Sequence, residues 1–216
     1  MTDVAMAGIA SRQRYKLITG SVMPRPIALV TTLNPDGSVN AAPYSAFNYM
    51  CEDPPLCALG IERYGDESHR EGEIKDTLRN ILARGEFVVN MVDGPMLERM
   101  VLCATDFPAH VSEPAEVGFA LAPSAAVSTP RVADAPVAWE CRRYSVLDYS
   151  TLRAIVFGEI VSMHFRDGLL DPQTMRVDLD QYQPWGRLGG PNYCETSLRR
   201  RVPTPSFDPS KGPQRV

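Results

Sequence analysis

The alternation of hydrophobic and polar positions divides the chain into short strands and a few helices. Runs rich in β-branched and apolar residues, bounded by Gly, Pro, Asn or Asp, are typical of strands. The sequence NPDG at 34–37 predicts a tight turn, because proline presets an early φ and glycine accepts a positive φ. The runs predict strands at 27–33, 39–43, 56–61, 86–92, 137–147 and 152–165, the first two joined as a hairpin by that turn.

Helical spacing is clearest at 74–84, where Leu78, Ile81 and Leu82 share one face. Gly85 follows at the position of a C-terminal cap. A second helix is expected at 11–19.

A third helix is expected at 95–104, with Leu97, Val101 and Leu102 facing inward. The region 107–130 is rich in alanine and proline and predicts a loop with a short helix near 114–117. Near the C-terminus, a Gly-Gly loop within 183–194 lies between two aromatic strand ends.

The order of these elements indicates a mainly β fold. Several strands, one hairpin and no strand–helix–strand rhythm predict an antiparallel barrel with peripheral helices. No GxGxxG follows a strand, so a Rossmann site is not indicated. We expect an N-terminal extension at 1–14, a barrel domain at 15–196 and a tail at 197–216. The tail is rich in proline and arginine, which is typical of flexible segments, and one hypothesis is that it packs across a second copy of the chain.

Composition narrows the function classes. The chain has 216 residues, 44% of them hydrophobic, and a formal charge of −4, which disfavours a nucleic-acid binder. Five cysteines without a CxxC spacing indicate reduced thiols, and three scattered histidines predict no metal site. No apolar run approaches the roughly 18 residues of a membrane span. We therefore expect a soluble cytoplasmic protein without a nucleic-acid or membrane partner.

Two segments suit a flat ligand. Thr31 and Thr32 end the first strand, and a run of small and polar residues follows the turn. Small residues let a ring approach the backbone, whose N–H groups then bind its polar edge. Each segment also has a structural explanation, as ordinary strand threonines or as a strand leaving the sheet through a polar loop. The candidates in the second run are Asn40, Ala41, Ala42, Ser45, Ala46, Phe47 and Asn48.

A third segment suits a phosphate. Lys75, Asp76 and Thr77 open the predicted helix 74–84. A helix N-terminus presents free N–H groups and a positive partial charge, to which the lysine adds a formal charge. The alternative is an ordinary cap formed by Asp76 or Thr77.

Seven motifs occur in order along the chain: PRPIALVTTLNPDGSVNAAPYSAFN at 24–48, DPPL at 53–56, KDTLRNI at 75–81, EFVVN at 86–90, APVAWEC at 135–141, GEIVSMH at 158–164 and GRLGGPNY at 186–193. Together they resemble the flavin reductase-like domain family, which includes flavoredoxin and the reductase component of nitrilotriacetate monooxygenase. The resemblance runs from about residue 15 to residue 193.

The resemblance implies an FMN-binding split β-barrel, a Greek-key antiparallel barrel that forms a homodimer. It places Thr31 and Thr32 by the flavin, assigns backbone contacts with the ring to residues 40–42, and assigns the phosphate to Ser45, Lys75 and Thr77. His164 matches a family histidine near the mouth of the site, where it would orient or protonate a nicotinamide or substrate. It is equally explained as a surface residue at a strand end. Leu29 stands where the family often has an aromatic residue.

The leading hypothesis is an NAD(P)H:FMN oxidoreductase that delivers reduced flavin to a monooxygenase. The alternative is a non-catalytic FMN-binding electron carrier of the flavoredoxin type, and a third hypothesis is an oxidase of a small amine. The flavin itself carries the redox chemistry, so the protein need supply only binding, orientation and electrostatics. A barrel is expected to have few charges for a second nucleotide site, so the nicotinamide would stack transiently on the flavin.

Overall fold

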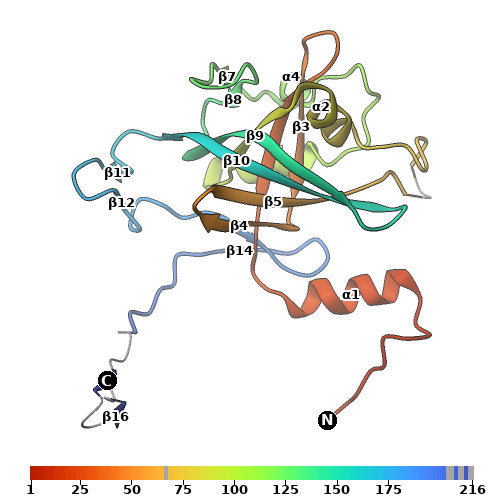
Figure 1. Cartoon of the computed structure of the whole chain (residues 1–216), viewed down its shortest axis with the longest axis horizontal. Helices are drawn as coiled ribbons and strands as arrows, with labels where there is room; N and C mark the ends of the chain where they lie inside the picture. Colours follow the sequence, from red (N-terminus) through yellow and green to blue (C-terminus); the bar gives the residue numbers. More distant parts are fainter. Residues whose placement is uncertain (66–67, 203–206, 209–211, 214–216) are drawn as a thin grey trace.

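The computed structural model describes residues 1–65, 68–202, 207–208 and 212–213 (Figure 1). Its centre is one antiparallel sheet with the strand order β3-β2-β6-β9-β10-β5-β4. The strands are β2 (Ala28–Leu33), β3 (Val39–Tyr44), β4 (Phe47–Glu52), β5 (Pro55–Glu62), β6 (Glu86–Met91), β9 (Val137–Asp148) and β10 (Arg153–Phe165). The mainly β fold is therefore confirmed.

The two edges of this sheet meet, which makes it a split barrel. Edge strands β3 and β4 are consecutive in the chain and are joined by residues 45–46 alone. The backbone N–H of Gly60 on β5 donates to the carbonyl of Ala46 at 2.7 Å. A Cβ on Gly60 would lie 2.9 Å from the Ala46 Cβ, so this close approach requires glycine.

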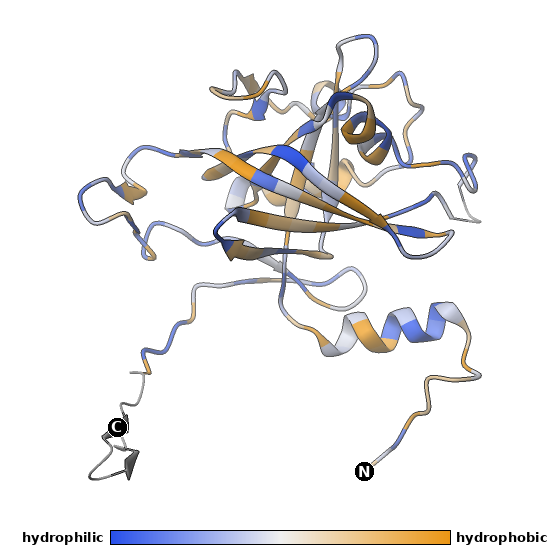
Figure 2. Ribbon diagram, in the orientation of Figure 1, coloured by the Kyte–Doolittle hydropathy of each residue, from blue (hydrophilic) through white to orange (hydrophobic). Residues whose placement is uncertain are grey.

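Helices lie outside the barrel. They are α1 (Ser11–Ser21), α2 (Asp76–Arg84), η1 (Gly94–Met96), α3 (Leu97–Leu102) and α4 (Glu113–Val117). Helix α2 covers β2 and β3, and it ends at Gly85 with φ 73°. Helix α1 has no buried residue and lies below the barrel, with hydrophobic and hydrophilic residues along its length (Figure 2).

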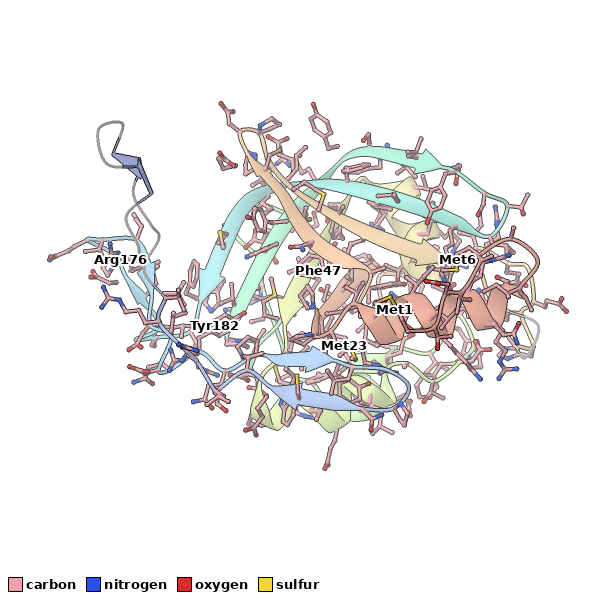
Figure 3. All side chains as sticks on the ribbon, turned by 90° about the horizontal axis from the view of Figure 1, so that it is seen from below. Met1, Met6, Met23, Phe47, Arg176 and Tyr182 are labelled. Carbon is pink, nitrogen blue, oxygen red and sulfur yellow. The ribbon has the colours of Figure 1, made fainter. Side chains whose placement is uncertain are left out.

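Five further pairs of short strands complete the fold of the described residues. The strands β1 (Arg25–Pro26), β13 (Trp185–Arg187) and β14 (Tyr193–Glu195) form a three-stranded sheet. Seen from below, α1 and the β13–β14 hairpin cross the same end of the barrel (Figure 3). The remaining strands pair as β7 (Leu121–Ala122) with β8 (Arg131–Val132), β11 (Leu170–Asp171) with β12 (Arg176–Val177), and β15 (Phe207–Asp208) with β16 (Gly212–Pro213).

The barrel interior is a single apolar cluster built from alternate residues of the strands. Its largest fully buried members include Phe87, Leu59 and Ile61. A second cluster, outside the barrel wall, packs Leu29 against Met96 and Met100. Leu29, where an aromatic was expected from the family pattern, is fully buried in this second cluster.

The structure differs from the sequence-based expectations in three places. Residues 47–52, for which no strand was predicted, form β4, with only Phe47 buried, because an edge strand leaves its other positions in solvent. Leu82 is 42% exposed on α2. In α3, Val101 and Leu102 are exposed, and the inward residues are Met100 with the flanking Met96 and Cys103. The helix begins later than predicted, after a 3₁₀ turn, which rotates its buried face.

No helix among the described residues is long and apolar enough to cross a membrane. The predicted packing of the tail on a second copy concerns residues that lie mostly outside the described part of the chain. Of the tail, the structure describes 197–202, 207–208 and 212–213.

Candidate functional site

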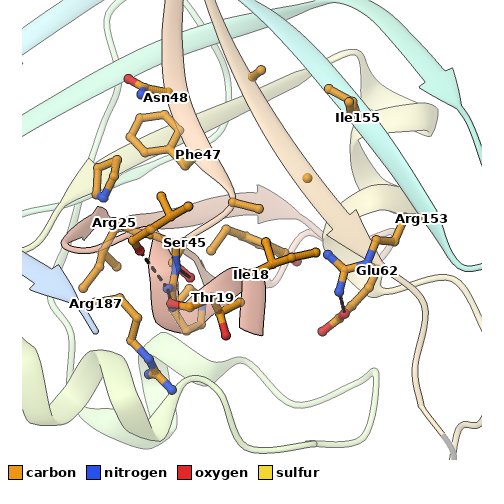
Figure 4. Close-up of a pocket in the computed structure, with 18 of the residues that line it drawn as sticks. Ile18, Thr19, Arg25, Ser45, Phe47, Asn48, Glu62, Arg153, Ile155 and Arg187 are labelled. Atoms are coloured by element: carbon orange, nitrogen blue, oxygen red, sulfur yellow. Dashed lines mark hydrogen bonds and ion pairs between the residues drawn. The ribbon is translucent and has the colours of Figure 1, made fainter. Parts of the chain in front are cut away.

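A cavity of about 1060 Å³ lies between the end of the barrel, α1 and the β13–β14 hairpin (Figure 4). That volume is at the upper end of the range for cofactor pockets. Its floor contains small residues from β3, β5 and the β3–β4 connection, namely Ala42, Ser45, Ala46, Ala58 and Gly60. Small side chains leave the backbone accessible to a flat ligand. Phe47, Ile155 and Phe157 add apolar walls.

Arg25 holds the three segments that enclose the cavity. Its guanidinium donates to the carbonyls of Thr19 and Val22 at the end of α1, the latter at 3.2 Å. It also donates to the Leu188 carbonyl at 3.0 Å and to Ser45 Oγ at 3.3 Å. All of these partners are neutral oxygens, so none of them offsets the positive charge of Arg25.

Cationic side chains line the other walls. Lys75, at the start of α2, has its ammonium 4.3 Å from the centroid of the Tyr64 ring. Arg153 on β10 is paired with Glu62 at 2.6 Å. Arg187 on β13 donates to the Gly190 carbonyl at 2.7 Å and to the Tyr193 hydroxyl. Figure 4 shows Arg25 and Arg187 on one side of the cavity and the Arg153–Glu62 pair on the other.

Tyr44 lines the cavity, but its hydroxyl is not accessible from the cavity. Its hydroxyl is buried and has no hydrogen-bond partner among the described residues. Burial raises the pKa of Tyr44, so the hydroxyl stays protonated at neutral pH. The Thr77 hydroxyl is the nearest polar influence on it, so the Tyr44 hydroxyl belongs to the buried side of β3 and not to the cavity.

Six of the predicted site residues line this cavity. They are Ala42, Ser45, Ala46, Phe47 and Asn48, with Lys75. The structure thus brings together the second and third segments singled out in the sequence.

Thr32, Asn40 and Thr77 lie elsewhere, in a buried network behind β3. The Asn40 amide donates to Thr32 Oγ1 at 3.1 Å and to Thr77 Oγ1 at 3.0 Å. Asn80 donates to the same Thr32 oxygen at 3.0 Å. Thr31 is also buried and donates to the Pro130 carbonyl at 2.7 Å. The three threonine hydroxyls and the Asn40 amide are thus bound to protein partners. Thr31, Thr32, Asn40 and Thr77 do not line the cavity.

Ala41 and Asp76 are likewise engaged by the protein. The Ala41 N–H donates to Glu113 Oε2 at 3.0 Å, and burial raises the pKa of Glu113 to about 7. Asp76 is 5% exposed and forms a two-bond ion pair with Arg70, at 2.5 and 2.9 Å. Asp76 therefore anchors the loop before α2 and is not a cap, since Lys75 occupies the N-cap position.

His164 lies at the opposite end of β10 from the cavity residue Arg153. Phe157, the cavity residue nearest to His164 on this strand, is seven positions away, which corresponds to roughly 23 Å of extended chain. Burial lowers the pKa of His164, with the nearby charge of Arg131 as a further cause. Within one protomer, His164 does not line the cavity.

The helix at 11–19 was predicted from the sequence, but its place beside the cavity was not, and neither were the arginines. Arg14, Arg25, Arg153 and Arg187 line the cavity, and of these Arg25 and Arg187 stood in two of the motifs. The expectation that a barrel has few charges for a second nucleotide site stays a prediction, although five cationic side chains reach this cavity from five separate segments.

The fold and the site define a split-barrel protein with a cofactor-sized cationic cavity. The chain belongs to the flavin reductase-like family, because the family model "Flavin reductase like domain" matches residues 19–186. This membership makes it a flavoprotein oxidoreductase of the flavin reductase type.

Solved structures agree with this family. The chain is 55% identical to the 2-nitrobenzoate 2-nitroreductase NbaA of Pseudomonas fluorescens, with a TM-score of 0.87 over 98% of this chain and 100% of that one. It is 29% identical to nitrilotriacetate monooxygenase component B from Bacillus cereus, with a TM-score of 0.85 over 94% and 98%. A split-barrel protein from Shewanella frigidimarina NCIMB 400, at 18% identity, has a TM-score of 0.76 over 91% and 94%, which bears on the fold alone.

Proposed function

We propose that the chain is an NAD(P)H-dependent oxidoreductase that binds FMN in the cavity between the barrel end and α1. The observation that carries the proposal is the cavity itself. It joins a floor of small residues, apolar walls and cationic groups without carboxylate partners. A flavin needs the first two for its ring and the third for its phosphate.

The phosphate is assigned to Ser45 and Lys75, whose hydroxyl and ammonium both line the cavity. The ring edge is assigned to the backbone around Ala42 and Ala46, with Asn48 as a polar partner. Thr31, Thr32, Asn40, Ala41, Asp76 and Thr77 are assigned a positioning role, since their hydrogen bonds hold β3 and α2 together behind the cavity.

When bound, FMN accepts a hydride equivalent from a nicotinamide and passes electrons to an acceptor. The chain contributes binding, orientation and exclusion of water. Helix α1 covers one side of the cavity, and Arg25 keeps this cover attached to the β13–β14 hairpin and to residue 45.

Two acceptors are supported by relatives. Similarity to a nitrilotriacetate monooxygenase component B supports delivery of reduced flavin to a monooxygenase partner. The 55% identity to a 2-nitrobenzoate 2-nitroreductase over 98% of the chain favours a second candidate, reduction of an aryl nitro group. Reduction of such a group to a hydroxylamine takes up four electrons and four protons and releases one water. Two NAD(P)H and two protons supply these electrons and protons.

Anaerobic titration of the FMN-loaded protein with NADH and with NADPH tests this function. A reductase loses its visible flavin absorption with about one equivalent of nicotinamide. Persistence of the oxidised spectrum with both nicotinamides, together with rapid reduction by a redox protein partner, would instead identify the flavoredoxin-type electron carrier. Supplying a nitroaromatic to the reduced protein then separates the two acceptors.

A homodimer is also proposed. Exposed apolar side chains gather on α1 and on the hairpin between β9 and β10, including Ile18, Tyr144, Tyr149 and Leu152. Monomers rarely leave so many large apolar groups in solvent without a partner surface. A second subunit would also be needed to bring His164 to a cavity. A monomer by light scattering at micromolar concentration, with FMN bound, would contradict the dimer.

A further inference from the structure

The cavity carries more positive charge than one flavin phosphate requires. Among its described lining residues, five are cationic and only Glu62 is acidic. Glu62 is paired with Arg153, which leaves Arg14, Arg25, Lys75 and Arg187 without a carboxylate partner among the described residues. The whole chain has a net charge of −4, so this excess is local. A concave surface with charge of one sign attracts ligands of the other.

The excess charge occurs on two walls of the cavity. Lys75 lies at the start of α2, and the proposed FMN phosphate accounts for it together with Ser45. Arg25 and Arg187 lie opposite each other on paired strands, because Arg25 of β1 is the register partner of Arg187 of β13. Arg25 already donates to four neutral oxygens, so in this pair Arg25 adds positive charge and Arg187 supplies the free donors for a second anion.

Arg187 is held in a fixed orientation beside an aromatic ring. Its guanidinium lies 4.5 Å from the centroid of Tyr193 and donates to the Tyr193 hydroxyl and the Gly190 carbonyl. Those two bonds use two of its five N–H donors, so the fork can still bind a carboxylate. Fixing the arginine before binding reduces the entropy lost when a ligand arrives.

The walls next to this pair are apolar and aromatic. Tyr193, Phe47 and Ile18 line the same cavity. A cation pair beside such a surface matches a ligand that joins a carboxylate to an aromatic ring.

Resting on the proposed function, we propose that Arg187, with Arg25 beside it, forms a second anion subsite that binds the carboxylate of a small aromatic acid and holds that substrate against the flavin. Arg187 is therefore a specificity-determining residue. It selects carboxylate-bearing acceptors over neutral aromatic ones of the same size.

The test compares Arg187→Gln with the unaltered protein by calorimetry, using 2-nitrobenzoate, benzoate and nitrobenzene as probes. Loss of a charge-assisted bidentate contact is expected to weaken both carboxylates roughly 10-fold to 100-fold and to leave nitrobenzene unchanged. Arg187→Lys keeps the charge without the fork and is expected to recover part of the loss. Arg142→Gln removes one positive charge outside the cavity and serves as the control. Thermal unfolding of each variant checks that it is folded.

Other results overturn the subsite. An equal loss for nitrobenzene would show that Arg187 acts through packing. A rise in the NAD(P)H KM with every acceptor, with unchanged carboxylate binding, would assign Arg187 to the nicotinamide diphosphate. A fall in FMN affinity matching the fall for carboxylates would assign it to the flavin phosphate. If the unaltered protein binds no FMN, the proposed function fails, whereas the carboxylate titrations still decide whether the subsite exists.

Discussion

Replacing Lys75 by methionine separates the phosphate from the ring in flavin binding. The substitution removes the ammonium and keeps an apolar stem of similar length. Its contact with the Tyr64 ring, at 4.3 Å, is also lost, but that loss affects every ligand equally. A charge-assisted hydrogen bond contributes roughly 1.5–3 kcal/mol, which corresponds to about 10-fold to 150-fold in affinity. Lys75→Met should therefore weaken FMN by that factor and leave riboflavin, which has no phosphate, nearly unchanged.

The assay is the quenching of flavin fluorescence during titration, with FMN and riboflavin measured on each variant. Thr77→Val is the matched control from the same helix turn, because Thr77 is 1% exposed and its hydroxyl accepts from Asn40 rather than facing the cavity. That variant is expected to lower stability by about 1–3 kcal/mol while the ratio of the two affinities stays constant. Equal losses of FMN and riboflavin in Lys75→Met would refute the phosphate assignment, and a changed ratio in Thr77→Val would restore Thr77 to the phosphate site.

Three further predictions concern stability. Gly158→Ala should lower the free energy of unfolding in urea by roughly 1–3 kcal/mol, because a Cβ there would lie 2.3 Å from Phe87 Cζ in a packed core; an unchanged midpoint would contradict this. Burial acts to raise the pKa of Asp76, but Arg70, the Tyr64 hydroxyl and the charge of Arg79 together outweigh it and hold that pKa below its ordinary value, so this stabilisation is present above about pH 4 and is lost as the pH falls further. Asp76→Asn should therefore cost roughly 3–5 kcal/mol at pH 7, with a smaller difference from the unaltered protein in acid, as thermal unfolding across pH would show. Burial raises the pKa of Glu113 to about 7, so the folded state binds the extra proton and stability falls as the pH rises from about 4.5 to 7; Glu113→Gln should flatten that decline, and an unchanged pH profile would argue against it.

The barrel could be predicted because its signals are local. The turn at 34–37 contains Gly37 with φ 88°, and the end of α2 contains Gly85 with φ 73°, so each glycine stands where a positive φ is required. Strand β10 follows from a nearly continuous apolar and β-branched run, whereas β9 mixes such residues with charged ones. Strand β4 escaped prediction because it is an edge strand with one buried residue, and its exposed Tyr49 and Met50 do not alternate with polar positions.

The candidate site could be predicted only in part, since its residues come from distant segments. Ser45 and Lys75 stand in short motifs whose chemistry is readable from the sequence. Asn40 and Thr77 are also polar residues of these motifs, but they face a buried network. Only the tertiary structure separates their environment from that of Ser45 and Lys75. Arg25 and Arg187 are 162 positions apart and meet through the pairing of β1 with β13, which no local pattern indicated.

The central claim is that FMN binds between the barrel end and α1. A crystal structure of the protein grown with saturating FMN tests it most directly. The account predicts the flavin phosphate within hydrogen-bond distance of Lys75 Nζ or Ser45 Oγ, with the ring against residues 42–48. A flavin bound anywhere else, or an empty cavity under those conditions, would contradict it.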